Sequence, residues 1–349
     1  MQPYLTALAE GRTLTQEEAE AAMHLMMRGE ASPEQIAGLL MGLRARGETL
    51  DELVGFTRVM RQYAVPVRVD DPHAIDLCGT GGDRSGTFNI STAAAFVCAG
   101  AGVTVVKHGN RSVSSQAGSA DVLEALGVVI DLGAEGVERC LEEVGIAFAF
   151  APRFHPAMRH VMPVRRALGV RTFFNILGPL CNPAGVRRQL VGAFRPDVAA
   201  TMAAILARLG AEHVVTVHAE DGLDELSLSA PTATYEYRRG DEAPRAGRVE
   251  PEALGLPRVP LEQLRGGDAE ANARLLRRVL EGEAGPHRDV VLLNATCALY
   301  VSGRFGDDLE ACLEAARESI DSGAALARLE RLIDVSNRVA REAARQPAA

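Results

Sequence analysis

A helical pattern of apolar and polar positions runs through the first 65 residues. Apolar side chains recur every three or four positions, as at Ile36, Leu39 and Leu43, which is the spacing of one helix face. Three such stretches begin with a capping box, in which a carboxyl or amide residue follows a hydroxyl residue by three positions: Thr15 with Glu18, Ser32 with Gln35, and Thr49 with Glu52. Because no strand-like alternation occurs here, residues 1–70 are predicted to form a small all-helical domain.

From about Ala74 the pattern changes to short β-rich runs separated by Ala-rich helical stretches. The predicted strands are Ala74–Leu77, Val103–Val106, Val128–Ile130, Ile146–Phe150, Gln189–Val191, His213–Val217 and Asp289–Leu293. The predicted helices include Ser91–Ala101, Ala117–Leu126, Pro196–Leu209 and Asp307–Ile320. This alternation indicates an α/β domain over residues 71–349, with a mostly parallel central sheet flanked by helices. Thr232–Tyr237 is a candidate antiparallel edge strand, and the tail after Asn337 is expected to fray.

Composition narrows the class of protein. The 349 residues suit two domains, and 47% hydrophobic and 24% charged residues are typical of a globular protein. A net charge of −9 argues against a nucleic-acid partner. The six cysteines lack metal-ligand spacing, and neither a signal peptide nor an apolar run long enough for a membrane span is visible. We therefore expect a cytoplasmic protein with no membrane partner.

A glycine-rich loop is the first candidate for chemistry. Gly79-Thr-Gly-Gly-Asp83 follows a predicted buried strand and precedes a helix that begins near Ser91. Glycines let backbone amides approach an anion, and the helix amino terminus adds its dipole. The hydroxyls of Thr87, Ser91 and Thr92 and the amide of Asn89 add further donors. The alternative is a tight turn that needs glycine only for its backbone angles, but the density of hydroxyls favours phosphate binding.

Two further segments carry cations and carboxylates. Lys107-His-Gly-Asn-Arg-Ser-Val-Ser-Ser115 follows the next predicted strand, and its cations and serines suit a polyanion; a solvated turn is the alternative. Ser119 is expected to cap or open the next helix and to face the same site. Asp224-Glu225 follows another strand and suits Mg²⁺, which prefers oxygen ligands and substrate phosphates, although acidic turns are usually solvated.

A helical stretch between these segments carries several arginines, any of which suits a substrate carboxylate. Spacing alone does not choose among Arg159, Arg165, Arg166 and Arg171.

In this order, the segments resemble the anthranilate phosphoribosyltransferase family. The matching text is Gly79–Asp83, Asn89-Ile-Ser-Thr92, Lys107–Ser115, Arg171-Thr-Phe-Phe-Asn-Ile-Leu-Gly-Pro179 and Gly222-Leu-Asp-Glu-Leu226. The resemblance covers nearly the whole chain. Departures are slight: Cys181 stands where threonine is common, and Leu226 where isoleucine is common. Membership implies an active site between the two domains and a homodimer formed through the helical domain. A helical segment around residues 156–182 is expected to join the helical domain.

The resemblance also implies roles for individual residues. Phosphoribosyl pyrophosphate would be surrounded by Gly79, Gly82, Asp83, Thr87, Asn89, Ile90, Ser91, Thr92, Lys107, His108, Gly109, Asn110, Arg111, Ser112, Val113, Ser114, Ser115 and Ser119. Ser91 with Glu225 would hold one Mg²⁺, and Asp224 with Glu225 a second. Asn110 and Arg165 would contact anthranilate.

The expected reaction gives N-(5-phosphoribosyl)anthranilate and pyrophosphate, as in tryptophan biosynthesis. Lys107 would stabilise the leaving group, and His108 would either accept a proton or only pack in its loop. Two other functions remain open: a pyrimidine-nucleoside phosphorylase of the same architecture, which uses inorganic phosphate, and a nucleic-acid-binding relative without catalysis. The Asp224-Glu225 pair favours a pyrophosphate donor and so argues against the phosphorylase. The net negative charge argues against the nucleic-acid-binding relative.

Overall fold

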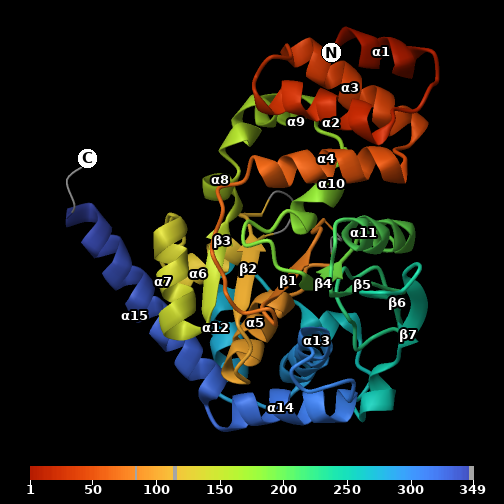
Figure 1. The fold of residues 1–349 in the computed structure, drawn as a ribbon. Coiled ribbons are helices and arrows are strands. Elements are labelled where there is room, and N and C mark those ends of the chain that lie inside the picture. The colour runs from red at the N-terminus through yellow and green to blue at the C-terminus, as the bar shows by residue number, and fades with distance from the viewer. Residues whose placement is uncertain (83–84, 113–115, 346–349) are drawn as a thin grey trace.

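The computed structural model describes residues 1–82, 85–112 and 116–345. A helical unit at the amino terminus stands above a larger unit built on one β-sheet (Figure 1). This confirms the predicted fold class, a small helical domain followed by an α/β domain with a mostly parallel sheet. No helix among the described residues is long and apolar enough to cross a membrane.

Four helices form the amino-terminal unit: α1 (Gln2–Ala9), α2 (Gln16–Met27), α3 (Pro33–Arg46) and α4 (Leu50–Gln62). All three predicted capping boxes are present, at Thr15, Ser32 and Thr49. In each box the hydroxyl and the residue three positions later satisfy amides that the helix leaves without partners. The starts of α2, α3 and α4 are therefore dictated by local sequence.

A segment from the middle of the chain completes this helical unit. It comprises α8 (Ala151–Phe154), η1 (Pro156–His160), α9 (Met162–Leu168), α10 (Phe174–Leu177) and η2 (Gly178–Leu180). Val161 and Leu177 are fully buried in the same apolar core as α2, α3 and α4. Phe173 stacks on Phe56 of α4, with ring centroids 4.3 Å apart. The helical unit thus depends on residues far apart in sequence.

Seven strands form the sheet, in the order β3-β2-β1-β4-β5-β6-β7. Their bounds are β1 (Ile75–Gly79), β2 (Val105–Gly109), β3 (Ile146–Phe150), β4 (Arg188–Gly192), β5 (His213–Ala219), β6 (Thr232–Arg238) and β7 (Arg245–Val249). The first five strands of the sheet order are parallel, and β6 and β7 are antiparallel. The chain runs from β1 toward β3 on one side, and β4 lies on the other side of β1. Such a switch point leaves a crevice at the carboxyl ends of the strands.

Both faces of the sheet are covered. The remaining helices are α5 (Ile90–Gly100), α6 (Ser119–Ala125), α7 (Ala134–Val144), α11 (Pro196–Arg208), α12 (Ala269–Leu280), α13 (Pro286–Ser302), α14 (Leu309–Asp321) and α15 (Ala324–Arg345), with short η3 (Pro251–Leu254) and η4 (Leu261–Leu264). Neighbouring strand residues point to opposite faces. Leu190 accordingly packs in the core with α5 and α13, whereas Val191 packs in the core with α11 and the helical unit.

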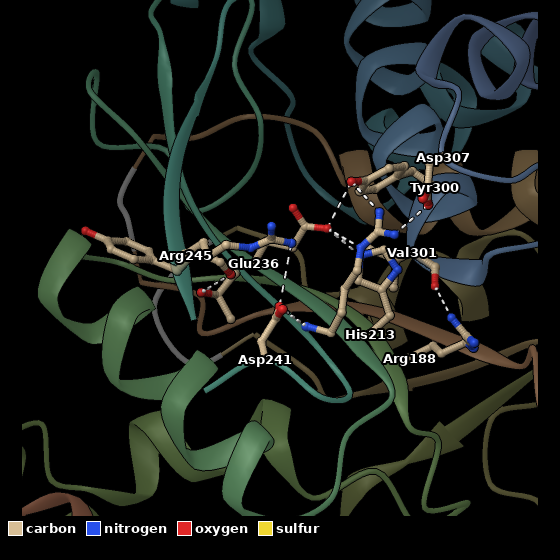
Figure 2. A network of polar contacts seen from close by, with 11 residues as sticks. Arg188, His213, Glu236, Asp241, Arg245, Tyr300, Val301 and Asp307 are labelled. Carbon is tan, nitrogen blue, oxygen red and sulfur yellow. Dashed lines mark hydrogen bonds and ion pairs between the residues drawn. The ribbon is translucent and has the colours of Figure 1, made fainter. Parts of the chain in front are cut away.

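A polar network fixes the amino end of β5 and the antiparallel extension (Figure 2). Glu236 of β6 accepts a hydrogen bond from the Tyr300 hydroxyl at 2.9 Å and lies 2.9 Å from His213 Nε2. The hydrogen bond with His213 is the main reason that the pKa of Glu236 falls to about 2. Arg238 joins this group to Asp307 at 2.6 Å. The network lies at the opposite end of β5 from the loops that carry the predicted site.

Four sequence-based expectations are wrong. Val128–Ile130 belongs to no strand, because Val129 N donates to the side chain of Ser336 at 3.1 Å and to no neighbouring strand. Asp289–Leu293 lies inside α13, a helix buried on nearly all sides, whose apolar run is indistinguishable from a buried strand by pattern alone. Thr232–Tyr237 is antiparallel as predicted but is not the edge, since β7 pairs with it. Helix α15 continues past Asn337 to Arg345.

Candidate active site

The predicted phosphate and metal segments meet at one edge of the sheet. They follow β1, β2 and β5, whose carboxyl ends lie side by side with that of β4. This is the edge that faces the helical unit in Figure 1. Segments separated by more than a hundred residues are therefore brought together by the parallel sheet.

The glycine-rich loop after β1 encloses a carboxylate of the acidic pair. Gly81 N donates to Asp224 Oδ2 at 2.7 Å, and the backbone there has a φ of +66°. A Cβ at Gly79 would lie 2.7 Å from the same oxygen. Gly82 also has a positive φ of 76°. Asp83, predicted to contact substrate, lies outside the described residues. The glycines are thus required both by backbone angles and by the close approach of Asp224.

The first turn of α5 presents backbone and hydroxyl donors. The Thr92 hydroxyl is buried and has no hydrogen-bond partner among the described residues, so a ligand oxygen would satisfy it. Asn89 donates from Nδ2 to the Ala117 carbonyl at 3.2 Å and thereby ties this loop to the loop after β2. Ile90 is fully buried in the apolar core. Thr87 shares a hydrogen bond of 3.1 Å with Ser85.

Lys107 is buried beneath this helix terminus. Its Nζ donates to the Leu77 carbonyl at 2.6 Å and to Ser91 Oγ at 3.3 Å, and the residue is only 4% exposed. It is also the single lysine among the 37 Lys and Arg residues of the chain. A compact point charge suits this confined position better than a planar guanidinium. That compositional signal marks Lys107 independently of any motif.

The loop after β2 is held mainly by its own neighbours. Arg111 forms ion pairs with Asp121 at 3.0 Å and with Glu124, so its guanidinium is directed to α6. Ser112 N donates to Asp121 at 3.0 Å. A Cβ at Gly109 would lie 2.4 Å from Ser119 Oγ, which itself donates to the Asn110 carbonyl at 3.4 Å. The predicted contacts Val113, Ser114 and Ser115 lie outside the described residues.

The acidic pair contacts both the glycine-rich loop and α5. Besides the contact of Asp224 with Gly81, Glu225 Oε1 accepts a hydrogen bond from Ser91 N at 3.2 Å. Asp224 is buried. The structure therefore brings Ser91, Asp224 and Glu225 together near Lys107, as the sequence predicted. Among the described residues no group of three or more His, Cys, Asp or Glu side chains is arranged as a complete metal cage, and Mg²⁺ commonly uses one or two carboxylates with substrate phosphates.

A pair of buried imidazoles lies on the other face of β2. Adjacent strand residues alternate in direction, so His108 points away from Lys107 and toward His155, with ring centroids 5.2 Å apart. Burial, reinforced by the neighbouring imidazole, lowers the pKa of His108 to about 3, and burial lowers that of His155 to about 4. Both rings are therefore neutral near pH 7. Each Nε2 is buried without a partner among the described residues.

A polar contact beneath His108 supports this strand. Asp76 of β1 accepts hydrogen bonds from His108 N at 3.2 Å and from Asn182 Nδ2 at 2.8 Å. Complete burial raises the pKa of Asp76 to about 6, although these hydrogen bonds oppose the shift. Asn182 also donates to the Val106 carbonyl at 2.8 Å. The ends of β1 and β2 are thereby held in one register.

The structure distinguishes among the four arginines of the connecting segment. Arg165 is half-buried on α9, where its guanidinium lies 5.2 Å from the centre of the Phe174 ring. Burial lowers its pKa, and no carboxylate among the described residues contributes to that shift. Arg159 and Arg166 are exposed. Arg171 is exposed as well, but it donates to the Gly82 carbonyl and stacks on Phe194.

Sequence reasoning missed two of these features. Arg171 touches the glycine-rich loop and His155 faces His108, but neither was selected as a site residue. Nothing in the local sequence separates Arg171 from its three neighbours. His155 had one usable signal, since it lies in a stretch that follows a predicted strand, β3, parallel to the other three.

Comparisons with known proteins agree with this architecture. The helical bundle domain of the glycosyl transferase family matches residues 2–64, and the a/b domain of that family matches residues 71–326. An anthranilate phosphoribosyltransferase of Salinibacter ruber is 65% identical over 339 residues, covering 96% of this chain and 98% of its own. One from Thermomicrobium roseum is 57% identical over 338 residues, with coverage of 96% and 97%.

Solved structures are similar along nearly the whole length. The crystal structure of anthranilate phosphoribosyltransferase from Thermus thermophilus has a TM-score of 0.89 at 47% identity and covers 96% of this chain and 99% of its own. The Saccharomyces cerevisiae protein, in complex with phosphoribosyl pyrophosphate and Mg, has a TM-score of 0.87 at 26% identity, with coverage of 97% and 98%.

The fold and site thus define a glycosyltransferase built from a helical bundle domain and an α/β domain. Within this class, the chain is more than 50% identical to several anthranilate phosphoribosyltransferases over nearly its full length. The chain belongs to the anthranilate phosphoribosyltransferase family and is an enzyme.

Proposed function

We propose that this enzyme transfers the 5-phosphoribosyl group of phosphoribosyl pyrophosphate to the amine of anthranilate in a Mg²⁺-dependent reaction of tryptophan biosynthesis. The products are N-(5-phosphoribosyl)anthranilate and pyrophosphate. The observation that carries this proposal is the meeting of Lys107, the first turn of α5 and the pair Asp224-Glu225 at one sheet edge. Complexes of the yeast relative with phosphoribosyl pyrophosphate and Mg, and with 4-fluoroanthranilate, support both substrates.

The donor would lie against the loops after β1 and β2. Its phosphates suit the amino terminus of α5, where backbone amides and the helix dipole favour anions. The buried hydroxyl of Thr92 would gain an acceptor there. Lys107 would contact the pyrophosphate group while its Nζ stays anchored on the Leu77 carbonyl. Arg171 holds the glycine-rich loop from the helical unit.

Mg²⁺ fits the oxygen ligands that these loops supply. Ser91 and Glu225 would hold one ion, and Asp224 with Glu225 a second. When bound, the metal supplies positive charge that stabilises the leaving pyrophosphate. Glu225 now accepts from the first turn of α5, so the same carboxylate would connect the helix terminus and the metal.

Anthranilate would bind between His108 and α9. Arg165 offers a half-buried guanidinium whose pKa is shifted by burial and by no carboxylate among the described residues, which suits the acceptor's carboxylate. Asn110 would add a hydrogen bond. The neutral imidazoles of His108 and His155 present unpartnered Nε2 atoms, which suits them to accept a hydrogen bond from the aromatic amine.

In the proposed step, the bond from ribose C1 to the pyrophosphate oxygen breaks, and its electron pair stays on that oxygen. The lone pair of the neutral aromatic amine forms the new C1–N bond. The amine then loses one proton, for which His108 is the proposed first acceptor. Lys107 stabilises the charge that grows on the leaving group, and such preorganised electrostatic stabilisation is commonly a large catalytic contribution.

We also infer that the protein is a homodimer formed through the helical unit. This inference rests on the family resemblance, and Met41 on α3, an exposed large apolar side chain of that unit, is the residue chosen to test it. Sedimentation of the wild-type protein and of a Met41→Glu variant tests this inference, and a wild-type monomer at micromolar concentration would contradict it.

The loss of anthranilate fluorescence on adding phosphoribosyl pyrophosphate and Mg²⁺ tests the reaction. We expect loss that requires all three components. A parallel reaction with inorganic phosphate and a pyrimidine nucleoside tests the phosphorylase alternative. Folded protein that leaves the fluorescence unchanged would refute the proposed function.

A further inference from the structure

One buried side chain of α13 forms hydrogen bonds with the backbone of the loop that carries Asp224 and Glu225. We call this contact, between Asn294 and Leu226, the clasp. Asn294 is 2% exposed. Its Oδ1 accepts from Leu226 N at 3.1 Å, and its Nδ2 donates to Leu226 O at 2.9 Å. The same Nδ2 donates to the Val290 carbonyl at 2.9 Å within α13. One carboxamide therefore holds both polar groups of the residue directly after Glu225.

The position of this clasp leaves the acidic pair little freedom. On its other side, the Asp224 backbone lies against β4 so closely that a Cβ at Gly192 would come 1.5 Å from the Asp224 carbonyl oxygen. Within the loop, Asp221 accepts from Ser227 Oγ at 2.6 Å. The backbone around Glu225 is thus confined between the end of β4 and the side chain of Asn294.

The helix that carries Asn294 also packs against α5, the helix that carries Ser91. Helix α13 packs against α5, where Cys98 Sγ donates to the Ala295 carbonyl at 3.7 Å. Residue Ala295 directly follows Asn294. The carboxyl-terminal turn of α5 and the loop after β5 therefore contact neighbouring residues of α13, although they are separated by more than a hundred residues in sequence.

A carboxamide is the side chain that this position requires. It accepts from an N–H and donates to a C=O at once, as a neighbouring strand would. Aspartate lacks the donor and would add a negative charge near Glu225. An apolar residue would leave a buried peptide group without partners, which costs free energy. The need to satisfy Leu226 explains an asparagine among the mostly apolar buried residues of α13.

We propose that Asn294 is a positioning residue for the pyrophosphate and metal site. It fixes the peptide after Glu225, and so sets where the carboxylates of Asp224 and Glu225 stand relative to Ser91. This inference rests on the proposed function, since it assumes that those carboxylates receive a metal ion with the donor.

The test measures metal binding as well as activity. Mn²⁺ serves as a paramagnetic probe, and its free concentration is followed by electron paramagnetic resonance in the presence of phosphoribosyl pyrophosphate and without acceptor. For Asn294→Ser and Asn294→Ala we expect Mn²⁺ affinity to fall by about 10- to 100-fold, the usual effect of losing an outer-shell contact of a metal site. The Mg²⁺ concentration for half-maximal activity should rise in parallel, while the anthranilate KM stays within about twofold.

A matched control on the same helix is Thr296→Val. The Thr296 hydroxyl is fully buried and donates to Leu292 O at 2.7 Å within α13, so its hydrogen bond is made inside the helix and not to the acidic loop. This variant should lose some thermal stability and keep wild-type Mn²⁺ affinity. Such a result separates positioning from a general weakening of α13.

Each remaining outcome is decisive. Folded Asn294 variants with wild-type Mn²⁺ affinity would overturn the proposal alone. If neither variant folds, Asn294 has a structural role in place of a positioning role, and the proposal also falls. Wild-type protein that binds no Mn²⁺ with phosphoribosyl pyrophosphate and shows no turnover would refute the proposed function, and this inference with it.

Discussion

Replacing Lys107 with methionine removes the chain's one lysine ammonium group while keeping an unbranched side chain of similar length. In the wild type, Nζ lies 2.6 Å from the Leu77 carbonyl and 3.3 Å from Ser91 Oγ. It is therefore held where the pyrophosphate is expected. Two unit charges about 4 Å apart interact by about 4 kcal/mol at an effective dielectric constant of about 20.

Only the charge that develops during bond breaking affects kcat. If the leaving group gains about half a unit of charge, Lys107 contributes about 2 kcal/mol, and a full unit gives about 4 kcal/mol. These values correspond to a loss in kcat between about 30-fold and about 1000-fold. Removal of one preorganised donor in other enzymes costs about 100- to 1000-fold, which agrees with this range.

Steady-state fluorescence assays measure kcat, and circular dichroism confirms that the Lys107→Met variant is folded. The matched control is Arg139→Met, which removes a cation of α7 that is paired with Glu342 at 2.6 Å and should leave kcat within about twofold, since exposed ion pairs contribute little. Because Lys107 is the only lysine, acylation of the peptide that contains it, measured by mass spectrometry apart from acylation of the amino terminus, gives a second assay. Bound phosphoribosyl pyrophosphate should protect Lys107 from acylation. A Lys107→Met variant with kcat within about fivefold of wild type would refute the electrostatic role.

Three further predictions concern the metal, the acceptor and the imidazoles. Glu225→Gln should raise the Mg²⁺ concentration for half-maximal activity at least about tenfold; an unchanged Mg²⁺ titration contradicts the metal role. Arg165→Met should raise the anthranilate KM about 10- to 100-fold, the loss of a charged hydrogen bond, and leave the donor KM unaltered; equal changes in both would show that another arginine binds the acceptor. Burial lowers the pKa values of His108 and His155 to about 3 and about 4, so their stabilising effect is complete above the unfolded value near 6.5 and is lost as pH falls toward 4. Thermal unfolding of His155→Gln should accordingly depend less on pH between 6.5 and 4 than that of the wild type, and equal slopes would show that His155 is not buried neutral.

Local sequence was sufficient wherever a short-range interaction decides the structure. The capping boxes at Thr15, Ser32 and Thr49 set three helix starts, and both partners of each box lie within four residues. The parallel strands were predictable because near-continuous apolar runs between helices are typical of sheets covered on both faces. Placing the loops after β1, β2 and β5 at one edge then followed from the parallel arrangement alone.

Features that depend on distant partners were not predictable. The apolar run Asp289–Leu293 is compatible with a strand or with a buried helix. It is helical because α13 packs between the sheet and α14. Arg111 belonged to a phosphate loop by its sequence position, yet its guanidinium pairs with Asp121 and Glu124. Which arginine of the connecting segment is half-buried depends on the packing of α9 with the other helices of the helical unit, and Arg159, Arg166 and Arg171 remain exposed.

The helical unit has a consequence for how the chain is made. Its apolar core combines Phe56 of α4 with Phe173 and Leu177, which lie more than a hundred residues later. During synthesis the first four helices therefore leave the ribosome with an uncovered apolar face. That face stays open until β1, β2 and β3 have also been made, and early contacts with other apolar segments are a typical source of aggregation. A fragment ending at residue 64 is expected to need a chaperone or a partner, whereas one ending after α11 carries every helix of that core.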